Sequence, residues 1–312
     1  MLALKRRGHG VVFLRSDSEA LPHDIDVLHI HRGCGSREFA FARAAQERGA
    51  AVVWDEDDDM SSIPKQSTSY RRYGGRRWQS RLIAMRRLFG HVDLVTTTTD
   101  TLAARLRDAG APTVVTVGNY VPAEWLRNRS PCGVAVTIGW IAGLEHQVDV
   151  ERVPVRDALG RLLDQRSDVH IHTIGLKLGL RHERSTNTPV VPLLELTERA
   201  AAFDIGIAPL ADIPLNRARS DVKLKEYAAA GLPWLASPVG PYAGLGERQG
   251  GRLVTDDRWY EELSRLVDKE RDRRKLAKRG RKWVEGETLE RNIHRWEDLL
   301  TATVEQVRAA RH

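Results

Sequence analysis

The sequence predicts an α/β protein made of two parallel-sheet domains that face each other across a cleft. Its length of 312 residues corresponds to about two domains. Short apolar runs alternate with helical stretches, a pattern typical of parallel sheets with crossover helices. This alternation pauses over residues 119–133, where Pro122 and Pro131 indicate a linker. We therefore expect domains at 1–130 and 131–285, and a helix at 286–312 that packs back toward the first domain.

Apolar runs and stop signals define the expected elements of the first domain. Strands are predicted at 11–14, 27–30, 51–54, 94–97 and 113–117, and helices at 36–48, 76–90 and 100–108. Gly49 and Gly110 follow two of these helices and Asp100 begins one of them, which are ordinary stop and start signals.

The second domain repeats the alternation. Strands are predicted at 134–139, 170–175, 189–191, 205–208, 234–237 and 252–254, and helices at 153–165, 194–202, 221–230 and 260–281. Residues 288–311 carry apolar side chains near one face and are expected to form the closing helix. Because ligands of such sheets bind at the carboxyl ends of the strands, functional residues are expected directly after strands.

The composition excludes a secreted miniprotein, an integral membrane protein and a disordered tail. Hydrophobic residues make up 41% and charged residues 29%, which is typical of a globular chain. No apolar run approaches the ~18 residues of a membrane span, and the first residues lack the layout of a signal peptide. Cys34 and Cys132 form no disulfide framework, which favours the cytoplasm. The net charge of +7 favours anionic partners.

The strongest local signal for a binding site lies at residues 216–237. Ser220 or Asp221 can cap a helix that Gly231 ends, and Pro233 prevents its continuation. The start of a helix carries unpaired N–H groups and a positive dipole end, which together favour phosphate.

Charged residues around this helix start extend the argument. Arg219 precedes the helix and Lys223 lies in its first turn, while Glu226 lies one turn deeper on the face of Lys223. The pattern predicts a nucleotide, with its diphosphate at the helix start and its ribose hydroxyls on the Glu226 carboxylate. The alternative is an amphipathic helix whose charges are solvated. The strand at 203–210 favours the nucleotide, because its loop would bring Asn216 to the same cleft.

Several segments resemble the large retaining family of two-domain (GT-B) glycosyltransferases known as group 1 or family 4, whose two domains are Rossmann-like. Residues 203–210 and 216–237 are similar to its pattern D-I-x-x-x-P-L followed by K-S-x-x-K-x-x-E-Y-x-A-x-G-x-P-x-x-A-S. Residues 138–149 resemble the first strand and glycine turn of its second domain. Residues 26–31 and 117–121 resemble its D-V-x-H-x-H and I-P-N-G-V segments.

The resemblance implies a role for each matching residue. Glu226 would hold the donor ribose, Arg219 and Lys223 the diphosphate, and His31 would face the transferred sugar. We accordingly expect His31, Arg219 and Lys223 to be catalytic. The remaining donor-binding positions are expected to be Ser220, Asp221, Gly139, Gly143, Pro209, Leu210 and Asn216. Gly139 and Gly143 would allow close approach of the backbone to the substrates.

Two features depart from the family pattern. The family often carries a second Glu eight residues before the ribose-binding one, where this chain has Ala218. Residues 4–11 resemble the end of the family's first helix and its second strand. The first strand and its glycine loop are therefore expected to be missing, and the acceptor side to be altered.

An acidic run, Asp55 to Asp59, follows the strand at 51–54. Its oxygen ligands would suit Mg²⁺ or Mn²⁺ on a sugar-nucleotide diphosphate, as in single-domain (GT-A) transferases. The alternative is an acidic loop beside the acceptor, with Asp57 and Asp58 near the cleft. We expect no metal site and no required cofactor, because only one such cluster exists and the phosphate-binding helix lies in the other domain.

Two pairs of residues that contain histidine are further candidates for the functional site. His146 and Asp149 are three residues apart and could form an acid/base pair or ligand contacts in the cleft, or merely a capped turn. Of His29 and His31, we expect His31 to face the cleft and His29 to lie in the core or at the surface.

Residues 65–89 form a basic segment without Asp or Glu. Trp78, Leu82, Met85 and Phe89 form one apolar stripe, which either packs on the first sheet or contacts a membrane or an anionic acceptor. Binding of nucleic acid through arginines and aromatic rings is not expected, because no known nucleic-acid module is present.

Together these observations predict a cytoplasmic glycosyltransferase, with peripheral membrane contact through residues 65–89. It would move a sugar, with retention, from a nucleotide-diphosphate donor to an acceptor such as a glycan, a lipid-linked sugar or a small molecule. The alternatives are a metal-dependent GT-A-type transferase using Asp55 to Asp59, or a non-catalytic nucleotide-binding or scaffold protein of GT-B ancestry.

Overall fold

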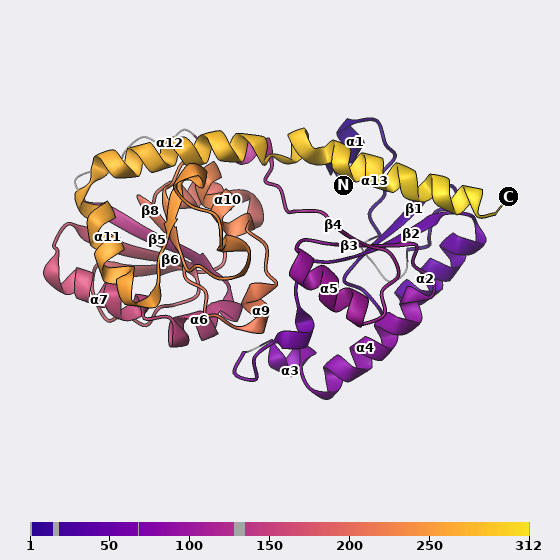
Figure 1. Cartoon of the computed structure of the whole chain (residues 1–312), viewed down its shortest axis with the longest axis horizontal. Coiled ribbons are helices and arrows are strands. Elements are labelled where there is room, and N and C mark those ends of the chain that lie inside the picture. Colours follow the sequence, from indigo (N-terminus) through magenta and orange to yellow (C-terminus); the bar gives the residue numbers. More distant parts are fainter. Residues whose placement is uncertain (1, 15–18, 68, 128–134, 312) are drawn as a thin grey trace.

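The chain forms two α/β domains side by side, and a long helix runs from the second domain across the first (Figure 1). The computed structural model describes residues 2–14, 19–67, 69–127 and 135–311. The expected domain boundary at 130/131 falls outside these residues.

The first domain is built on a four-stranded parallel sheet in the order β1–β2–β3–β4. Its strands are β1 (Val27–His31), β2 (Ala51–Glu56), β3 (Leu94–Thr97) and β4 (Val114–Thr116). Its helices are α1 (Leu2–Arg6), α2 (Ser36–Glu47), α3 (Tyr70–Tyr73), α4 (Arg76–Phe89) and α5 (Asp100–Asp108), with short 3-10 helices at Met60–Ser62 (η1) and Ala123–Trp125 (η2). The continuous apolar run of β2 is buried on both faces, as expected of a strand covered by helices on each side.

The second domain is built on a six-stranded parallel sheet in the order β10–β9–β8–β5–β6–β7. Its strands are β5 (Val136–Ala142), β6 (Val169–Gly175), β7 (Ser185–Thr188), β8 (Ile205–Ala208), β9 (Trp234–Ala236) and β10 (Gly251–Leu253). Its helices are α6 (Gln147–Arg152), α7 (Val155–Gln165), α8 (Leu196–Ala200), α9 (Pro214–Arg217), α10 (Val222–Ala229), α11 (Trp259–Asp268) and α12 (Glu270–Gly286). Short 3-10 helices lie at 144–146 (η3), 193–195 (η4), 240–242 (η5), 247–249 (η6) and 256–258 (η7).

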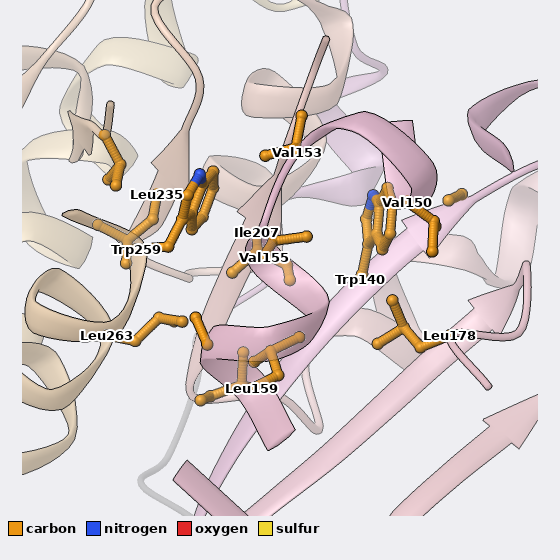
Figure 2. Packing of buried hydrophobic residues seen from close by; sticks show 14 of the residues in the cluster. Trp140, Val150, Val153, Val155, Leu159, Leu178, Ile207, Leu235, Trp259 and Leu263 are labelled. Atoms are coloured by element: carbon orange, nitrogen blue, oxygen red, sulfur yellow. The ribbon is translucent and has the colours of Figure 1, made fainter. Parts of the chain in front are cut away.

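The main core of the second domain lies between its sheet and helices α7 and α11. Figure 2 shows Trp140 of β5, Leu159 of α7 and the α11 residues Trp259 and Leu263 within this cluster. These side chains are at most 1% exposed. Burial on this scale, at roughly 25 cal/mol per Å² of apolar surface, holds β5 and the loop that follows it in place.

Helix α13 (Leu289–Ala309) belongs to the first domain in space although it follows the second in sequence (Figure 1). Its Ile293 packs with Ala3 and Leu4 of α1. Its Trp296 meets the ring of His29 edge-on, with ring centroids 5.9 Å apart. His29 and His31 share one face of β1, as residues two apart must, but the α13 contact partly buries His29 while His31 stays exposed.

The chain passes between the domains twice, and the two passages lie side by side. Val121 of the first passage bridges Thr288 of the second. The N–H of Val121 donates to the Glu287 carbonyl at 3.2 Å, and the N–H of Leu289 donates to the Val121 carbonyl at 2.8 Å. The two passages therefore form one hydrogen-bonded hinge.

Three expected elements differ from the observed ones. Residues 11–14 are irregular, because no strand among the residues that the structure describes pairs with them. The strand expected at 189–191 is instead the polar segment Ser185–Thr188, which pairs with β6. The helix expected at 260–281 is broken at Lys269, which joins α11 to α12 with φ −110° and ψ 80°.

Candidate functional site

The loops after β5 and β8 lie where the strand order of the second sheet reverses. The chain runs from β5 outward to β6 and β7, then returns to β8 on the other side of β5. Neighbouring loops diverge at such a switch point, and α/β sheets bind their ligands there. The loop after β5 carries His146 and Asp149, and the segment after β8 leads through α9 to α10. Most of the residues predicted to bind the donor therefore gather at this switch point.

Helix α10 begins without a side-chain cap. Asp221 occupies the N-cap position, but its carboxylate pairs with Lys225 at 3.0 Å. The Ser220 hydroxyl accepts a hydrogen bond from Asn119 at 3.0 Å. The capping role predicted for Ser220 or Asp221 is therefore wrong. An uncapped first turn retains the N–H groups and the dipole that favour an anion.

Lys223 and Glu226 form an ion pair on one face of α10. Nζ of Lys223 donates to Oε2 of Glu226 at 2.6 Å. The Glu226 side chain is 8% exposed and that of Lys223 is 20% exposed. Because a carboxylate accepts through both oxygens, Glu226 can hold the cation and still accept from hydroxyl groups.

Four predicted residues form one hydrogen-bonded network beneath this helix start. Asp149 is fully buried, and its Oδ2 lies 2.7 Å from Nδ1 of His146. Its Oδ1 accepts from Nδ2 of Asn216 at 2.7 Å and from the N–H of Ala211 at 2.8 Å. Arg219 closes the network, with Nε donating to Oδ1 of Asn216 at 3.0 Å and Nη1 lying 3.5 Å from Nε2 of His146.

Burial determines what these residues can do. Burial and the nearby Arg219 cation lower the pKa of His146, which favours the neutral ring. Asn216 is 0% exposed, and its side chain bonds only within the protein. The expectation that Asn216 contacts the donor is therefore wrong, because its contacts hold Arg219 and the loop after β8. The His146–Asp149 pair is likewise an internal contact and does not cap a turn at the surface.

Four further predicted positions support the loops from within. Pro209 and Leu210 are buried, and the Leu210 N–H donates to the Ser237 hydroxyl at 2.9 Å. A Cβ at Gly139 would lie 1.8 Å from the Phe203 ring, so packing within the sheet requires this glycine. The expectation that Gly139 admits a substrate to the backbone is therefore wrong. Gly143 ends β5, and a Cβ there would meet only the flexible end of Glu145.

Lys225 joins the helix of the candidate site to the hinge. Its side chain is 4% exposed, and its Nζ lies 3.0 Å from Asp221 and 2.8 Å from Glu287. The same Nζ donates to the carbonyl of Asn119 at 2.8 Å. The sequence prediction missed this cluster, although the four-residue spacing of Asp221 and Lys225 is a signal for an ion pair.

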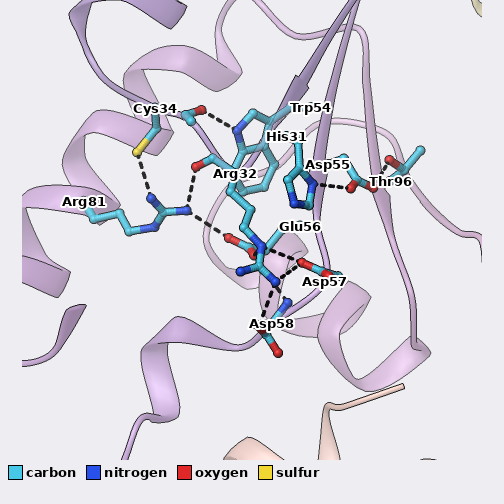
Figure 3. Close-up of polar contacts among 11 residues, drawn as sticks. His31, Arg32, Cys34, Trp54, Asp55, Glu56, Asp57, Asp58, Arg81 and Thr96 are labelled. Atoms are coloured by element: carbon cyan, nitrogen blue, oxygen red, sulfur yellow. Dashed lines mark hydrogen bonds and ion pairs between the residues drawn. The ribbon is translucent and has the colours of Figure 1, made fainter. Parts of the chain in front are cut away.

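His31 lies at the carboxyl end of β1 in the first domain. Its Nδ1 lies 2.9 Å from Oδ2 of Asp55, whose Oδ1 accepts from the Thr96 hydroxyl at 2.6 Å (Figure 3). The hydrogen bond to Asp55 raises the pKa of His31. Burial alone would raise the pKa of Asp55, but the hydrogen bonds from His31 and Thr96 outweigh it and lower that pKa. The ring of His31 is thus oriented, and its side chain is 54% exposed.

The acidic run is neutralised by arginines. Arg32 reaches Oδ1 of Asp57 at 2.6 Å and Oδ2 of Asp58 at 2.7 Å, and Arg81 donates to Glu56 at 2.9 Å (Figure 3). Asp59 pairs with Arg105. Within residues 2–14, 19–67, 69–127 and 135–311, no three acidic, histidine or cysteine side chains are grouped to hold a metal ion. Arg32 has a φ of +60°, a strained conformation for a non-glycine residue, and its three carboxylate contacts stabilise it.

The buried Glu56 carboxyl should make the free energy of unfolding depend on pH. Burial raises its pKa from 4.5 to about 6, although Arg81 and Arg32 oppose this shift. Because the folded pKa is the higher one, this group stabilises the fold below pH 4.5 and loses that contribution as the pH rises through 6. The loss should be about 2 kcal/mol. Urea denaturation of wild type and Glu56→Gln from pH 4.5 to 7.5 should show this slope only in the wild type; equal slopes would contradict the assignment.

The basic segment packs its apolar stripe inward. Met85 and Phe89 of α4 are buried in the core of the first domain, and Trp78 packs partly against both domains. The exposed side of α3 and α4 carries the arginines and Ile83, which is 71% exposed. The interpretation that the stripe packs on the first sheet is therefore confirmed. No helix in the described part of the chain is both long and apolar enough to cross a bilayer.

Ala218 stands where the family often has a second Glu. It is fully buried and packs with the core of the first domain. Its carbonyl accepts a hydrogen bond from the Thr99 hydroxyl at 2.9 Å. A longer, charged side chain would not fit this contact between the domains.

The predicted residues thus fall into two groups. One group lies around the start of α10, and the other, with His31, Asp57 and Asp58, lies at the carboxyl end of the first sheet. Among the described residues, no hydrogen bond or ion pair joins His31 to Arg219, Lys223 or Glu226. The domains do meet nearby, through Thr99 with Ala218 and Asn119 with Ser220.

Comparison with known proteins agrees with this architecture. Residues 2–120 match the family model described as glycosyl transferase 4-like domain. Similar solved structures include HepE of Anabaena in complex with UDP (TM-score 0.63, 16% identity, 89% of this chain and 79% of that one) and sucrose-phosphate synthase of Thermosynechococcus elongatus (TM-score 0.62, 16% identity, 91% and 74%). A TarM mutant of S. aureus in complex with fondaparinux, α-GlcNAc-glycerol and UDP is also similar (TM-score 0.59, 11% identity). The match covers 80% of this chain and 51% of the TarM chain, so this chain spans about half the length of that protein. No curated protein matches the sequence.

The two facing parallel-sheet domains and the crossing helix α13 define the GT-B fold of glycosyltransferases. The match of residues 2–120 to the glycosyl transferase 4-like model falls within the first of these domains, and the chain as a whole has the GT-B fold. The single-domain GT-A alternative is wrong, because the chain has two separate parallel sheets and the carboxylates of its acidic run pair with arginines and His31.

Proposed function

We propose that the chain transfers a sugar from a nucleotide-diphosphate donor to an acceptor, with retention of the anomeric configuration. One observation carries this proposal: Arg219 and Lys223 flank the uncapped start of α10, and the Glu226 carboxylate lies one turn further along. The similar structures of HepE and of the TarM mutant were solved in complex with UDP, which supports a nucleotide donor.

The chemistry would rest on charge stabilisation. As the bond between sugar and phosphate breaks, negative charge gathers on the leaving diphosphate. Arg219, Lys223 and the first-turn N–H groups of α10 would stabilise that charge where it develops. In a retaining transfer of this type the departing phosphate oxygen takes the proton of the acceptor hydroxyl. His31, oriented by Asp55, would contact the transferred sugar from the first domain.

Binding of diphosphates tests the donor site. Glu226→Gln should weaken the best-bound nucleoside diphosphate by about tenfold or more, since it replaces the charged acceptor for ribose hydroxyls by a neutral amide. It should not weaken binding of inorganic pyrophosphate, because Lys223 keeps its charge and loses its ion pair with Glu226. Lys223→Met should weaken both ligands. Titration calorimetry would measure the affinities, with Glu198→Gln on exposed α8 as the matched control. Equal affinity of Glu226→Gln and wild type for every nucleoside diphosphate would remove the ribose assignment.

Turnover separates this proposal from a non-catalytic protein, and excess EDTA tests whether the transfer needs a metal ion. A non-catalytic nucleotide-binding protein would bind nucleoside diphosphates but release none from any sugar nucleotide. A metal-dependent enzyme would stop in excess EDTA. We propose that no metal is required, because the acidic run is occupied by arginines, so release of nucleoside diphosphate should continue in EDTA.

We also propose that α3 and α4 contact an acidic lipid surface through their arginines. The exposed members are Arg71, Arg72, Arg76, Arg77, Arg86 and Arg87. Each basic residue near such a surface contributes about 1 kcal/mol, so Arg76→Glu/Arg77→Glu should weaken binding to phosphatidylglycerol vesicles by at least about tenfold. Co-sedimentation with the vesicles would measure the binding, and Arg271→Glu/Arg274→Glu on α12 is the control variant, whose binding should change less. Equal binding of wild type to phosphatidylcholine vesicles would contradict an electrostatic contact.

A further inference from the structure

Arg219 differs from the neighbouring basic residues in the partners it has. Arg217 pairs with Asp212 at 2.6 Å, Lys223 with Glu226, and Lys225 with Asp221 and Glu287. Within the described part of the chain, the hydrogen bonds of Arg219 go to His146 and Asn216, and no ion pair links it to a carboxylate. It is thus a cation held by neutral groups.

The network also determines the tautomer of His146. A guanidinium group can only donate, so Nε2 of His146 must accept from Nη1 of Arg219. The proton of the neutral ring then lies on Nδ1, which donates to Asp149 at 2.7 Å. Burial and the Arg219 cation both favour this neutral form. Asp149 therefore fixes the ring with an acceptor facing Arg219.

Asp149 fixes the second acceptor in the same way. Its Oδ1 accepts from Nδ2 of Asn216, which turns Oδ1 of Asn216 toward Nε of Arg219. The backbone behind Asn216 is also fixed: a Cβ at Gly240, where φ is +55°, would lie 2.6 Å from the Asn216 carbonyl. One buried carboxylate thus orients both acceptors that hold the guanidinium.

We propose that Asp149 is a positioning residue for the donor diphosphate. Acting through His146 and Asn216, it holds Arg219 beside the start of α10 while leaving the charge of Arg219 available for an anion. A carboxylate in direct contact with Arg219 would hold it equally well but would compete with the diphosphate. This inference deepens the proposed function and rests on it.

The test is a double-mutant cycle on binding of the tightest of uridine, guanosine, adenosine and thymidine diphosphate. In Asp149→Asn the side-chain amide can donate to Nδ1 of His146, which moves the ring proton to Nε2 and turns a donor toward Arg219. The affinity should fall about tenfold or more, as is common when the partner that orients a binding group is changed. Arg219→Met should lower it at least as much. The double variant should bind no more weakly than Arg219→Met alone.

A merely structural Asp149 would give a different result. Its replacement would then weaken binding by the same factor with or without Arg219, and such additive effects would overturn the proposal. Asp204→Asn is the matched control, because Asp204 is a buried carboxylate at the opposite, amino-terminal edge of the same sheet, where it accepts from the Thr137 N–H. It should leave the affinity unchanged.

Three further outcomes of this experiment can be told apart. If Asp149→Asn does not fold, Asn216→Ala enters the same cycle, since Asp149 then keeps its contacts with His146 and the Ala211 N–H. Its effect should likewise vanish when Arg219 is absent, and additivity would overturn the proposal. If the wild type binds none of the four diphosphates, the proposed function itself fails and the inference fails with it. If it binds one and Asp149→Asn binds equally well, only the inference fails.

Discussion

Replacement of Arg219 by methionine is expected to slow sugar transfer by about 10²–10³-fold, the usual cost of removing one preorganised group that stabilises developing charge. Its guanidinium is already held at 3.0 Å by Asn216 and at 3.5 Å by His146 before any ligand arrives. Little reorganisation is then needed as charge builds on the leaving diphosphate. Steady-state release of nucleoside diphosphate from the donor that supports turnover would measure the effect.

Arg217→Met is the matched control for this prediction. Arg217 lies two residues earlier, is exposed, and pairs with the exposed Asp212. Its removal should change the rate less than about twofold, since an exposed ion pair contributes little. A similar loss of rate in both variants would show that general electrostatics, and not a held cation at the helix start, produces the effect.

The residues around α10 illustrate what the sequence could predict. Gly231 and Pro233 correctly placed the end of this helix, because both act through local backbone conformation. The buried runs of β5 and β8 were likewise predicted, since a continuous apolar run is a local signal. The irregular 11–14 segment was mispredicted because a strand also needs a partner, which local patterning does not supply.

The candidate site was predictable in its residue types but not in its contacts. His146 and Asp149 were singled out by spacing, but their link to Asn216 spans 67 residues. Gly139 was assigned to a ligand because nothing local reveals that Phe203 fills the space above it. The burial of Lys225 was not predicted, because it depends on the return of the chain at Glu287.

Replacement of this buried lysine is expected to have a large effect on stability. Lys225→Met should lower the free energy of unfolding by about 3 kcal/mol. Removing one partner of a buried ion pair costs about 3–5 kcal/mol, and the lower end applies because Asp221 and Glu287 keep 24% and 31% of their side chains exposed. Without the ammonium group, two carboxylates face each other and the carbonyl of Asn119 loses a donor. Urea denaturation at pH 7.5 would measure the loss.

Two further measurements identify its cause. Burial and the Glu287 charge already raise the pKa of Asp221, although Lys225 opposes the shift, and removal of Lys225 should raise it further. Because a raised folded pKa stabilises the protein only at low pH, the penalty of Lys225→Met should shrink as the pH falls toward 4. The triple variant Lys225→Met/Asp221→Asn/Glu287→Gln should recover most of the stability at pH 7.5, since it removes the uncompensated charges. A penalty that is independent of pH and persists in the triple variant would instead indicate lost packing, and the hinge would then not depend on this ion cluster.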